Sequence, residues 1–310
     1  MFILNTERSA MTHRNALLAV HFGALMFGLS GVFGKLAEST PLMITFGRAL
    51  FAVIALLLAA QFLRTGGGKP GWRQRGGLLL GGLLLGGHWL TFFVAVKVAG
   101  VGIATLGFAS FPAFTVLFEG LLFRERTRPV EFAMVGLVCA GLLLVTPHFD
   151  LASESTVGLL YGILSGLMFA LLSLLNRAVT RGVDPVQAAL WQNGTILICL
   201  LPFTWMSLPA VPALDWLWLA LLGVFCTGLA HSLFVASLKV LKARTTSVIF
   251  ALEPVYGIAF AWWLFNEQPT LRMLAGGTLI ILATVITSRM KAPAAPNTAT
   301  PLAQAPEARR

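Results

Sequence analysis

The sequence predicts an all-α integral membrane protein of ten transmembrane helices, arranged as two inverted repeats of five helices each. Three observations support this fold class. Of the 310 residues, 57% are hydrophobic and only 11% are charged, whereas a soluble domain carries about 25% charged residues. The apolar segments reach about twenty residues, the length that a ~30 Å hydrocarbon core requires of a helix. A pattern of aromatic residues, prolines and glutamates also recurs 142 residues later in the chain.

Ten apolar segments end at charged or turn residues, and each can cross a bilayer as a helix. None shows the alternating pattern of a transmembrane β-strand. The predicted spans are Asn15–Ala37, Pro41–Leu63, Gly76–Val96, Val101–Leu122, Val130–Pro147, Val157–Ala178, Pro185–Leu208, Trp216–Leu238, Thr245–Phe265 and Pro269–Ser288. Glycines at four-residue spacing in the sixth span, Gly158, Gly162 and Gly166, predict close helix contacts there.

Basic residues gather at alternate span ends. Eighteen of the 22 Lys and Arg residues fall on one predicted side of the membrane, whereas Lys35, Lys97 and Arg272 fall on the other. Because basic connections stay in the cytoplasm, we expect a multi-pass protein of the bacterial inner membrane with both termini cytoplasmic. The net charge of +10 therefore indicates membrane orientation and not nucleic-acid binding.

The internal repeat predicts the inverted arrangement. Matched positions include Lys35/Arg177, Phe108/Phe250, Pro112/Pro254 and Glu125/Glu267. Since each repeat holds an odd number of spans, the second copy crosses the membrane upside down. Inverted repeats are typical of alternating-access transporters, which bind their substrate near the midplane between the repeats.

The repeat also divides the chain into segments. We expect a cytoplasmic N-terminal lead at 1–14, a first repeat at 15–147, an external linker at 148–156, a second repeat at 157–289 and a disordered cytoplasmic tail at 290–310. Met1 and Met11 are both suitable start residues. The first apolar segment is interpreted as an uncleaved span because it is too long for a signal peptide. The three cysteines lie within apolar segments, so they predict neither a disulfide framework nor a metal cluster.

The chain resembles the drug/metabolite transporter superfamily, specifically its EamA-type branch with ten spans. The resemblance is carried by Gly47-Arg48-Ala49 in the second span and by the blocks Pro112–Glu125 and Pro254–Glu267, each followed by a glycine-bearing span. It covers about Asn15 to Arg289. Within this branch the chain is most similar overall to the YddG-type aromatic amino-acid exporters. The resemblance implies a basket-shaped helical fold around a central apolar cavity that admits aromatic and other apolar amino acids.

The expected function is that of a secondary transporter that exports aromatic and other apolar amino acids or related metabolites across the plasma membrane by alternating access. The alternatives are a drug or other small-metabolite exporter and, more remotely, an intramembrane enzyme. The sequence has no nucleophile–base arrangement, so we expect no catalytic residues, no cofactor and no metal. Without a GxxxxGK[ST] loop, ATP is not expected to drive transport. Proton antiport and facilitated diffusion both remain open. The expected partners are a small-molecule substrate and the lipid bilayer, with no nucleic acid, and the protein is expected to be a monomer.

Two carboxylates, Glu119 and Glu253, lie well within predicted spans. Near the centre of a span a charge costs about 2.5–3.5 kcal/mol. Glu253 is therefore either a contact for a substrate ammonium group or a proton-carrying site, or else a protonated structural residue that bonds to the backbone freed by the following proline. Its repeat counterpart is Phe111, so the symmetry of the fold does not require this carboxylate. Glu119, one turn from the cytoplasmic end, could pair with Arg124 or Arg126.

Two histidines, His88 and His231, fall near the midpoints of the third and eighth spans, one residue apart in the repeat register. A neutral imidazole can hydrogen-bond a ligand, and the ring titrates near neutral pH. Both are candidates for substrate binding and, together with Glu253, for proton coupling. The alternative is that each is a satisfied packing residue. Their spacing predicts no metal site.

Aromatic and amide side chains in the same spans could form the walls of a pocket. An amphipathic amino acid requires apolar walls and a few polar groups. Substrate contacts are expected from Phe92, Phe108, Phe111, Trp191, Asn193, Phe250 and Tyr256. The alternative for each aromatic residue is core or lipid-facing packing.

Two prolines and one arginine complete the candidates. Pro112 and Pro254 each remove a helical hydrogen bond, which makes them candidate hinges, with static kinks as the alternative. Arg48, in the outer third of the second span, either meets a ligand carboxylate in an open cavity or stabilises helix ends.

Overall fold

The computed structural model describes residues 12–62, 68–122, 129–145, 150, 152–230, 233, 237, 241, 249 and 252–288. Within these ranges the chain is helical, apart from turns and one isolated β-bridge between Gly68 and Val183. Five helical segments are long and apolar enough to cross a membrane, namely His13–Leu36, Pro41–Gln61, Trp72–Phe108, Glu154–Val179 and Pro185–Ala210. The predicted all-α membrane fold is confirmed.

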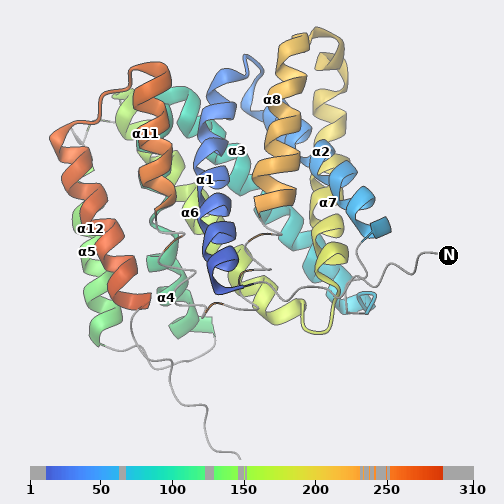
Figure 1. Ribbon diagram of the computed structural model, residues 1–310, viewed down its shortest axis with the longest axis horizontal. Helices are drawn as coiled ribbons and strands as arrows, with labels where there is room; N and C mark the ends of the chain where they lie inside the picture. Colours follow the sequence, from blue (N-terminus) through green and yellow to red (C-terminus); the bar gives the residue numbers. More distant parts are fainter. Residues whose placement is uncertain are drawn as a thin grey trace, which may run out of the picture.

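Helices stand side by side through most of the molecule (Figure 1). They are α1 (His13–Leu36), α2 (Pro41–Phe62), α3 (Trp72–Phe108), α4 (Phe111–Leu122), α5 (Pro129–Val145), α6 (Glu154–Val179), α7 (Pro185–Thr204), α8 (Ala213–Gly223), α11 (Glu253–Phe265) and α12 (Leu271–Ser288). A 3₁₀ turn, Trp205–Ala210, extends α7, and a π-helical turn, Val224–Leu229, extends α8. α1 begins and α12 ends at the lower end of the bundle in Figure 1, as an even number of crossings requires.

Local sequence explains where several helices begin. α1 starts where the Thr12 hydroxyl accepts a hydrogen bond from the backbone N–H of Asn15 (3.3 Å). α7 starts where the Asp184 carboxylate accepts one from the N–H of Gln187 (3.0 Å), with Pro185 at the first helical position. Such caps satisfy N–H groups that the helix itself leaves without an acceptor.

The third and fourth predicted spans meet close to the predicted place. The prediction ended the third span at Val96 and began the fourth at Val101, and α3 consists of two helices joined by a kink at Gly100, a non-helical residue whose φ is +82°. A second interruption, which the prediction did not contain, lies at residues 109–110, and α4 begins at Phe111. Pro112 therefore lies in the first turn of α4, where a missing N–H removes no helical hydrogen bond.

The ninth predicted span also differs. It was expected to run from Thr245 to Phe265 with Glu253 near its centre, but Glu253 is the first residue of α11 and Pro254 the second. Residues 245–248 and 250–251 of that prediction lie outside the described residues. A carboxylate in the first turn of a helix is favoured by the positive end of the helix dipole.

Small residues let the two repeats interleave. α3 of the first repeat packs along α6 of the second, and Gly107 faces Gly162 so closely that a Cβ added at Gly107 would lie 2.9 Å from the Cα of Gly162. A Cβ added at Gly158 would lie 2.2 Å from that of Ala99. The close contacts predicted from these glycines are confirmed, and they hold two backbones together without intervening side chains.

The outer surface carries large apolar side chains. Ile198 is 76% exposed and Trp263 is 77% exposed. In water, apolar surface on this scale would mark a binding face, but in a bilayer it contacts lipid chains. The exposure pattern therefore agrees with the membrane setting inferred from composition.

Candidate functional site

His88 lies inside the bundle. Its side chain is 8% exposed, and Nδ1 is 2.7 Å from the hydroxyl oxygen of Ser165 in α6. That hydroxyl donates its hydrogen to the backbone carbonyl of His88 (3.0 Å). Because a hydroxyl has only one hydrogen to donate, Nδ1 is the donor to Ser165. This network assigns the Nδ1–H tautomer, which leaves Nε2 of the neutral ring as an acceptor.

Phenylalanines surround this imidazole. The His88 ring centroid lies 5.0 Å from that of Phe108, 5.1 Å from that of Phe169 and 6.4 Å from that of Phe92. Phe111 stacks on Phe108 at 5.3 Å. These five residues, here named the aromatic cluster, come from α3, α4 and α6, so both repeats contribute.

Sequence reasoning placed four of these five residues correctly near one another. It missed Phe169 and the partner of His88, Ser165. A signal for Phe169 was present, because Phe27 and Phe169 occupy matched positions in the repeat. No pattern in the sequence pointed to Ser165, since a serine on a helix face has many packing roles.

Arg48 of α2 is buried beside the aromatic cluster, with 4% exposure. Its Nε donates to the hydroxyl of Thr227 (2.8 Å) and its Nη2 to the carbonyl of Cys226 (3.5 Å). Its guanidinium carbon lies 4.1 Å from the ring centroid of Trp89, in cation–π geometry. Both acceptors belong to the π-helical turn after α8, a local distortion often found at functional sites. These contacts connect Arg48 to the turn that follows α8.

Glu253 begins α11, which packs against α1 and α3. α1 in turn packs against the π-helical turn that accepts the hydrogen bonds of Arg48. No carboxylate oxygen of a described residue lies within 4.0 Å of the Arg48 guanidinium. Arg48 and Glu253 therefore lie on neighbouring elements without a direct ion pair.

Other predicted site residues lie apart from the aromatic cluster. Trp191 packs near Leu78 at the start of α7, with Arg75 5.8 Å from its ring. The Tyr256 hydroxyl is 3.3 Å from Nδ1 of His21, among residues of α1. Asn193 is buried, and its Oδ1 accepts no hydrogen bond from any described residue. His231 and Phe250 lie outside the described residues.

A second charged site closes the upper end of the bundle in Figure 1. Lys35, at the end of α1, forms an ion pair with Glu267, which follows α11. The second oxygen of Glu267 accepts a hydrogen bond from the backbone N–H of Val101 (3.1 Å). Gly100 interrupts α3 immediately before this N–H, so Glu267 replaces the acceptor that the helix lacks there.

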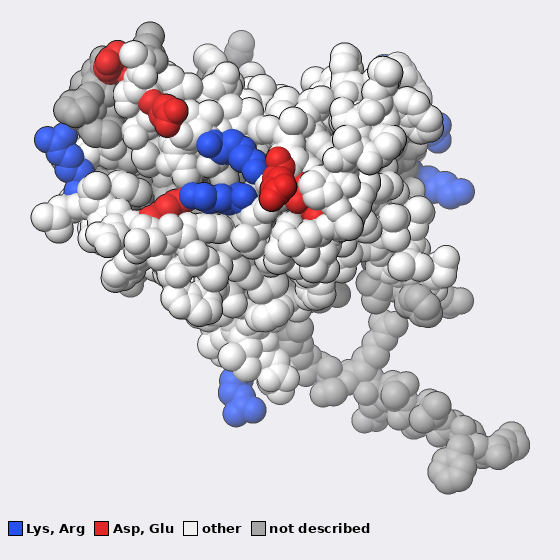
Figure 2. Space-filling model, turned by 90° about the horizontal axis from the view of Figure 1, so that it is seen from above, with Lys and Arg blue, Asp and Glu red and all other residues white. Residues whose placement is uncertain are grey.

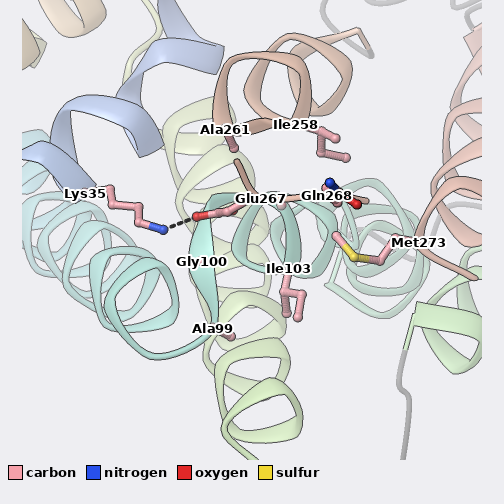
Figure 3. Close-up of a pocket in the computed structure, with 10 residues that line it drawn as sticks. Lys35, Ala99, Gly100, Ile103, Ile258, Ala261, Glu267, Gln268 and Met273 are labelled. Atoms are coloured by element: carbon pink, nitrogen blue, oxygen red, sulfur yellow. Dashed lines mark hydrogen bonds and ion pairs between the residues drawn. The ribbon is translucent and has the colours of Figure 1, made fainter. Parts of the chain in front are cut away.

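A cavity of about 340 Å³ lies beside this ion pair. Figure 3 shows Lys35 and Glu267 pointing toward each other on one side, with Ile103, Ile258 and Met273 on the other. From above, basic and acidic side chains lie next to one another in a hollowed part of the face, and further charged side chains lie toward its edges (Figure 2). The upper end thus combines an apolar hollow with paired charges.

A third cross-repeat contact involves Glu119. Its carboxylate accepts a hydrogen bond from Nη1 of Arg177, near the end of α6, at 2.7 Å. The sequence suggested Arg124 or Arg126 as the partner of Glu119, and both of those lie outside the described residues. Both side chains of the observed pair are partly exposed, at 42% for Arg177 and 33% for Glu119.

Comparison with known proteins places this geometry in context. The family model described as "EamA-like transporter family" matches residues 14–146 and again residues 156–289. A solved structure titled "Crystal structure of protein" superposes with a TM-score of 0.62 at 20% sequence identity, and the match covers 89% of this chain and 97% of that one. The double match and the superposition confirm the predicted fold of ten helices in two repeats.

Several curated proteins are similar in sequence. An uncharacterized transporter of Archaeoglobus fulgidus is 26% identical over 87% of this chain and 95% of its own length. The pseudopaline exporter CntI of Pseudomonas aeruginosa is 25% identical over 69% of this chain and 75% of its own length. Solute carrier family 35 member G1 of Homo sapiens is 25% identical over 84% of this chain and 75% of its own length.

Proposed function

The chain belongs to the EamA-like transporter family, and we propose that it exports aromatic and other apolar amino acids across the bacterial inner membrane. The observation that carries the proposal is the aromatic cluster around His88, with Arg48 and Glu253 on helices that pack against α3. A small amphipathic ligand needs apolar walls and a few well-placed polar groups. The resemblance to YddG-type exporters points to the same substrate class.

The proposed mechanism is alternating access between two inverted repeats. The helical interruption at residues 109–110 supplies a place where α4 can move relative to α3. Interrupted helices near the midplane are typical of such transporters. Pro112 and Pro254 each lie in the first turn of a helix beside the proposed site, where a hinge would redirect α4 or α11. We propose both termini in the cytoplasm and a monomer as the transporting unit.

Export of another small metabolite is the second candidate. It is favoured by the similarity to a protein named as a pseudopaline exporter. The fold and the family would be the same, but the ligand would differ. An apolar amino acid fits the aromatic cluster better, because four phenylalanine rings offer few groups to a highly polar ligand.

Uptake into vesicles tests the substrate. The purified full chain is reconstituted in liposomes, and entry of labelled tryptophan, phenylalanine and threonine is measured with and without a pH gradient. We expect saturable entry of tryptophan and phenylalanine, with threonine slower because it contacts the aromatic rings less. No flux of any amino acid above that of protein-free liposomes would contradict the proposed substrate.

Glu253→Gln tests the coupling. If Glu253 carries the proton, the downhill flux that this variant retains is no longer stimulated by the pH gradient. Glu154→Gln is the matched control, because Glu154 also begins a helix but is exposed. Behaviour of Glu253→Gln equal to that of the wild type in both conditions would remove Glu253 from the mechanism.

A further inference from the structure

The buried guanidinium of Arg48 is the starting point. An arginine in a span costs about 2.5–3.5 kcal/mol even on the lower scales, and a buried charge normally has an ionic partner. Arg48 is 4% exposed, yet no described carboxylate lies within 4.0 Å. Lys35 and Arg177, the basic residues with described ion pairs, are both more exposed. The most buried of these three cations is therefore the one without a carboxylate in contact.

The hydrogen bonds of Arg48 occupy only one edge of the guanidinium. Nε and Nη2 form one donor edge, and this edge meets Thr227 and Cys226 in the π-helical turn. A guanidinium has five N–H donors, and no described residue accepts a hydrogen bond from Nη1. The Nη1–Nη2 edge has the geometry that binds a carboxylate through two parallel hydrogen bonds.

The surrounding residues hold this group in place. Trp89 stacks against its face at 4.1 Å, and the π-helical turn fixes its position along α8. A Cβ added at Gly223, just before that turn, would lie 2.6 Å from the Arg48 carbonyl oxygen, so α2 and α8 are in backbone contact here. A donor edge held in position loses little conformational freedom when a ligand binds.

The neighbourhood of Arg48 has a matching negative group and an apolar side. Glu253 begins α11 against Gly28 of α1, where an added Cβ would lie 3.1 Å from the Glu253 carbonyl oxygen, and α1 packs against the π-helical turn that holds Arg48. Its carboxylate makes no ion pair with Arg48 within 4.0 Å. Phe93 connects Arg48 to the aromatic cluster, because its ring lies 5.9 Å from the guanidinium carbon and 5.7 Å from the ring of Phe92. A ligand with a carboxylate, an ammonium group and an apolar side chain would engage all three regions.

We propose that Arg48 binds the carboxylate of the transported ligand while Glu253 binds its ammonium group, so that the site selects zwitterionic α-amino acids with apolar side chains. This inference rests on the proposed function and specifies its chemistry. It excludes as good ligands the amines and amides that lack the carboxylate, and the acids that lack the ammonium group.

Three ligands of similar shape test the proposal: phenylalanine, phenylalanine amide and 3-phenylpropanoate. Dissociation constants are obtained from ligand-induced shifts in the Tm of the purified full chain. A hydrogen bond to a charged group contributes about 1.5–3 kcal/mol, so the wild type should bind phenylalanine about 10- to 100-fold more tightly than either analogue.

The variant Arg48→Gln should weaken phenylalanine binding by about the same 10- to 100-fold and leave binding of the amide within about twofold. Arg48→Lys keeps the charge but cannot donate two parallel hydrogen bonds to a carboxylate. Its affinity for phenylalanine should therefore fall between those of the wild type and Arg48→Gln. Arg177→Gln is the control, with all three affinities unchanged. Equal weakening of phenylalanine and the amide by Arg48→Gln would show a purely structural role and overturn the proposal.

The wild type alone also decides the question if Arg48→Gln fails to fold. Equal binding of phenylalanine and its amide by the wild type would overturn the assignment of Arg48 while leaving amino-acid transport intact. No binding of phenylalanine, tryptophan or any other apolar amino acid would instead contradict the proposed function, and this inference would fall with it. The two failures are thereby distinguished.

Discussion

Two of the opposite-charge pairs shared between the repeats differ in whether the charges touch. Lys35 and Glu267 form an ion pair at the upper end of the bundle, where Glu267 also accepts a hydrogen bond from the N–H of Val101. Arg48 is buried, and it forms no ion pair with Glu253 within 4.0 Å. Each pair takes its base from the first repeat and its acid from the second.

The difference separates a structural use of charge from a binding use. Both oxygens of the Glu267 carboxylate already make contacts that stabilise the fold, one with a lysine and one with a helix N–H. A guanidinium with one donor edge unused, beside a carboxylate that does not reach it, retains the capacity to bind a ligand. Keeping such charges apart lowers the stability of the fold in a low-dielectric interior. A role in ligand binding would explain why the protein keeps them.

The largest effect is expected when both inner charges are removed together. The double variant Arg48→Gln/Glu253→Gln should transport phenylalanine about 100-fold more slowly, because two charge-assisted contacts are lost. Its Tm should equal or exceed that of the wild type, since two incompletely compensated charges leave the interior. Vesicle flux and thermal unfolding measure the two quantities. A lower Tm with normal flux per folded molecule would show that Arg48 and Glu253 have a structural role and not a binding role.

The next effect concerns the interruption of α3. Gly100→Ala places a side chain at a φ of +82° and within 2.8 Å of the Glu267 carboxylate. Left-handed backbone costs a non-glycine residue about 1–2 kcal/mol, so Tm should fall clearly. Gly136→Ala is the control, because a Cβ added there meets no atom within 4 Å. An unchanged Tm for Gly100→Ala would show that Glu267 and the helix interruption are not coupled.

A smaller effect is expected at the outer pair itself. Both side chains are partly exposed, so the ion pair should contribute no more than about 1 kcal/mol. Glu267→Ala should lower Tm more than Lys35→Ala does, because it also leaves the Val101 N–H without its acceptor. A double-mutant cycle measures the coupling between the two side chains. Equal effects of the two single variants would argue against the capping role of Glu267.

The smallest effect is expected at the exposed pair, Arg177 and Glu119. Glu119→Gln should change the free energy of unfolding by less than about 0.5 kcal/mol, since exposed ion pairs contribute little and are screened by salt. Thermal unfolding at low and high ionic strength provides the measurement. A drop as large as that of Glu267→Ala would mean that exposure does not distinguish the cross-repeat contacts.

Sequence patterns predicted the helices and the repeat because these depend on composition and periodicity. They placed a break between Val96 and Val101, where the structure has the kink at Gly100. They did not locate the second interruption after Phe108, since proline position alone does not say which residue leaves the helix. They also did not show that the Val101 N–H would be capped by Glu267, 166 residues away. Such contacts exist only once the chain has folded.

The candidate site was predictable in depth but not in rotation about the helix axes. His88 and three phenylalanines were expected near the midplane, and the structure brings them together. Trp191 and Tyr256 were assigned to the same pocket, but their helices turn them toward other neighbours. Hydrophobicity varies too little around a membrane-buried helix to show which face meets the site.

The Lys35–Glu267 contact also bears on how the protein is made. The two residues are 232 positions apart. At about 5–20 residues per second, a ribosome needs roughly 10 to 50 seconds to make that length of chain. During this interval α1 is already synthesised while its partner α11 does not yet exist, and the N–H of Val101 has no Glu267 to meet. The early helices are therefore in the insertion machinery or the bilayer before these contacts can form. The contacts of Lys35 and the Val101 N–H form only after α11 and Glu267 have been synthesised.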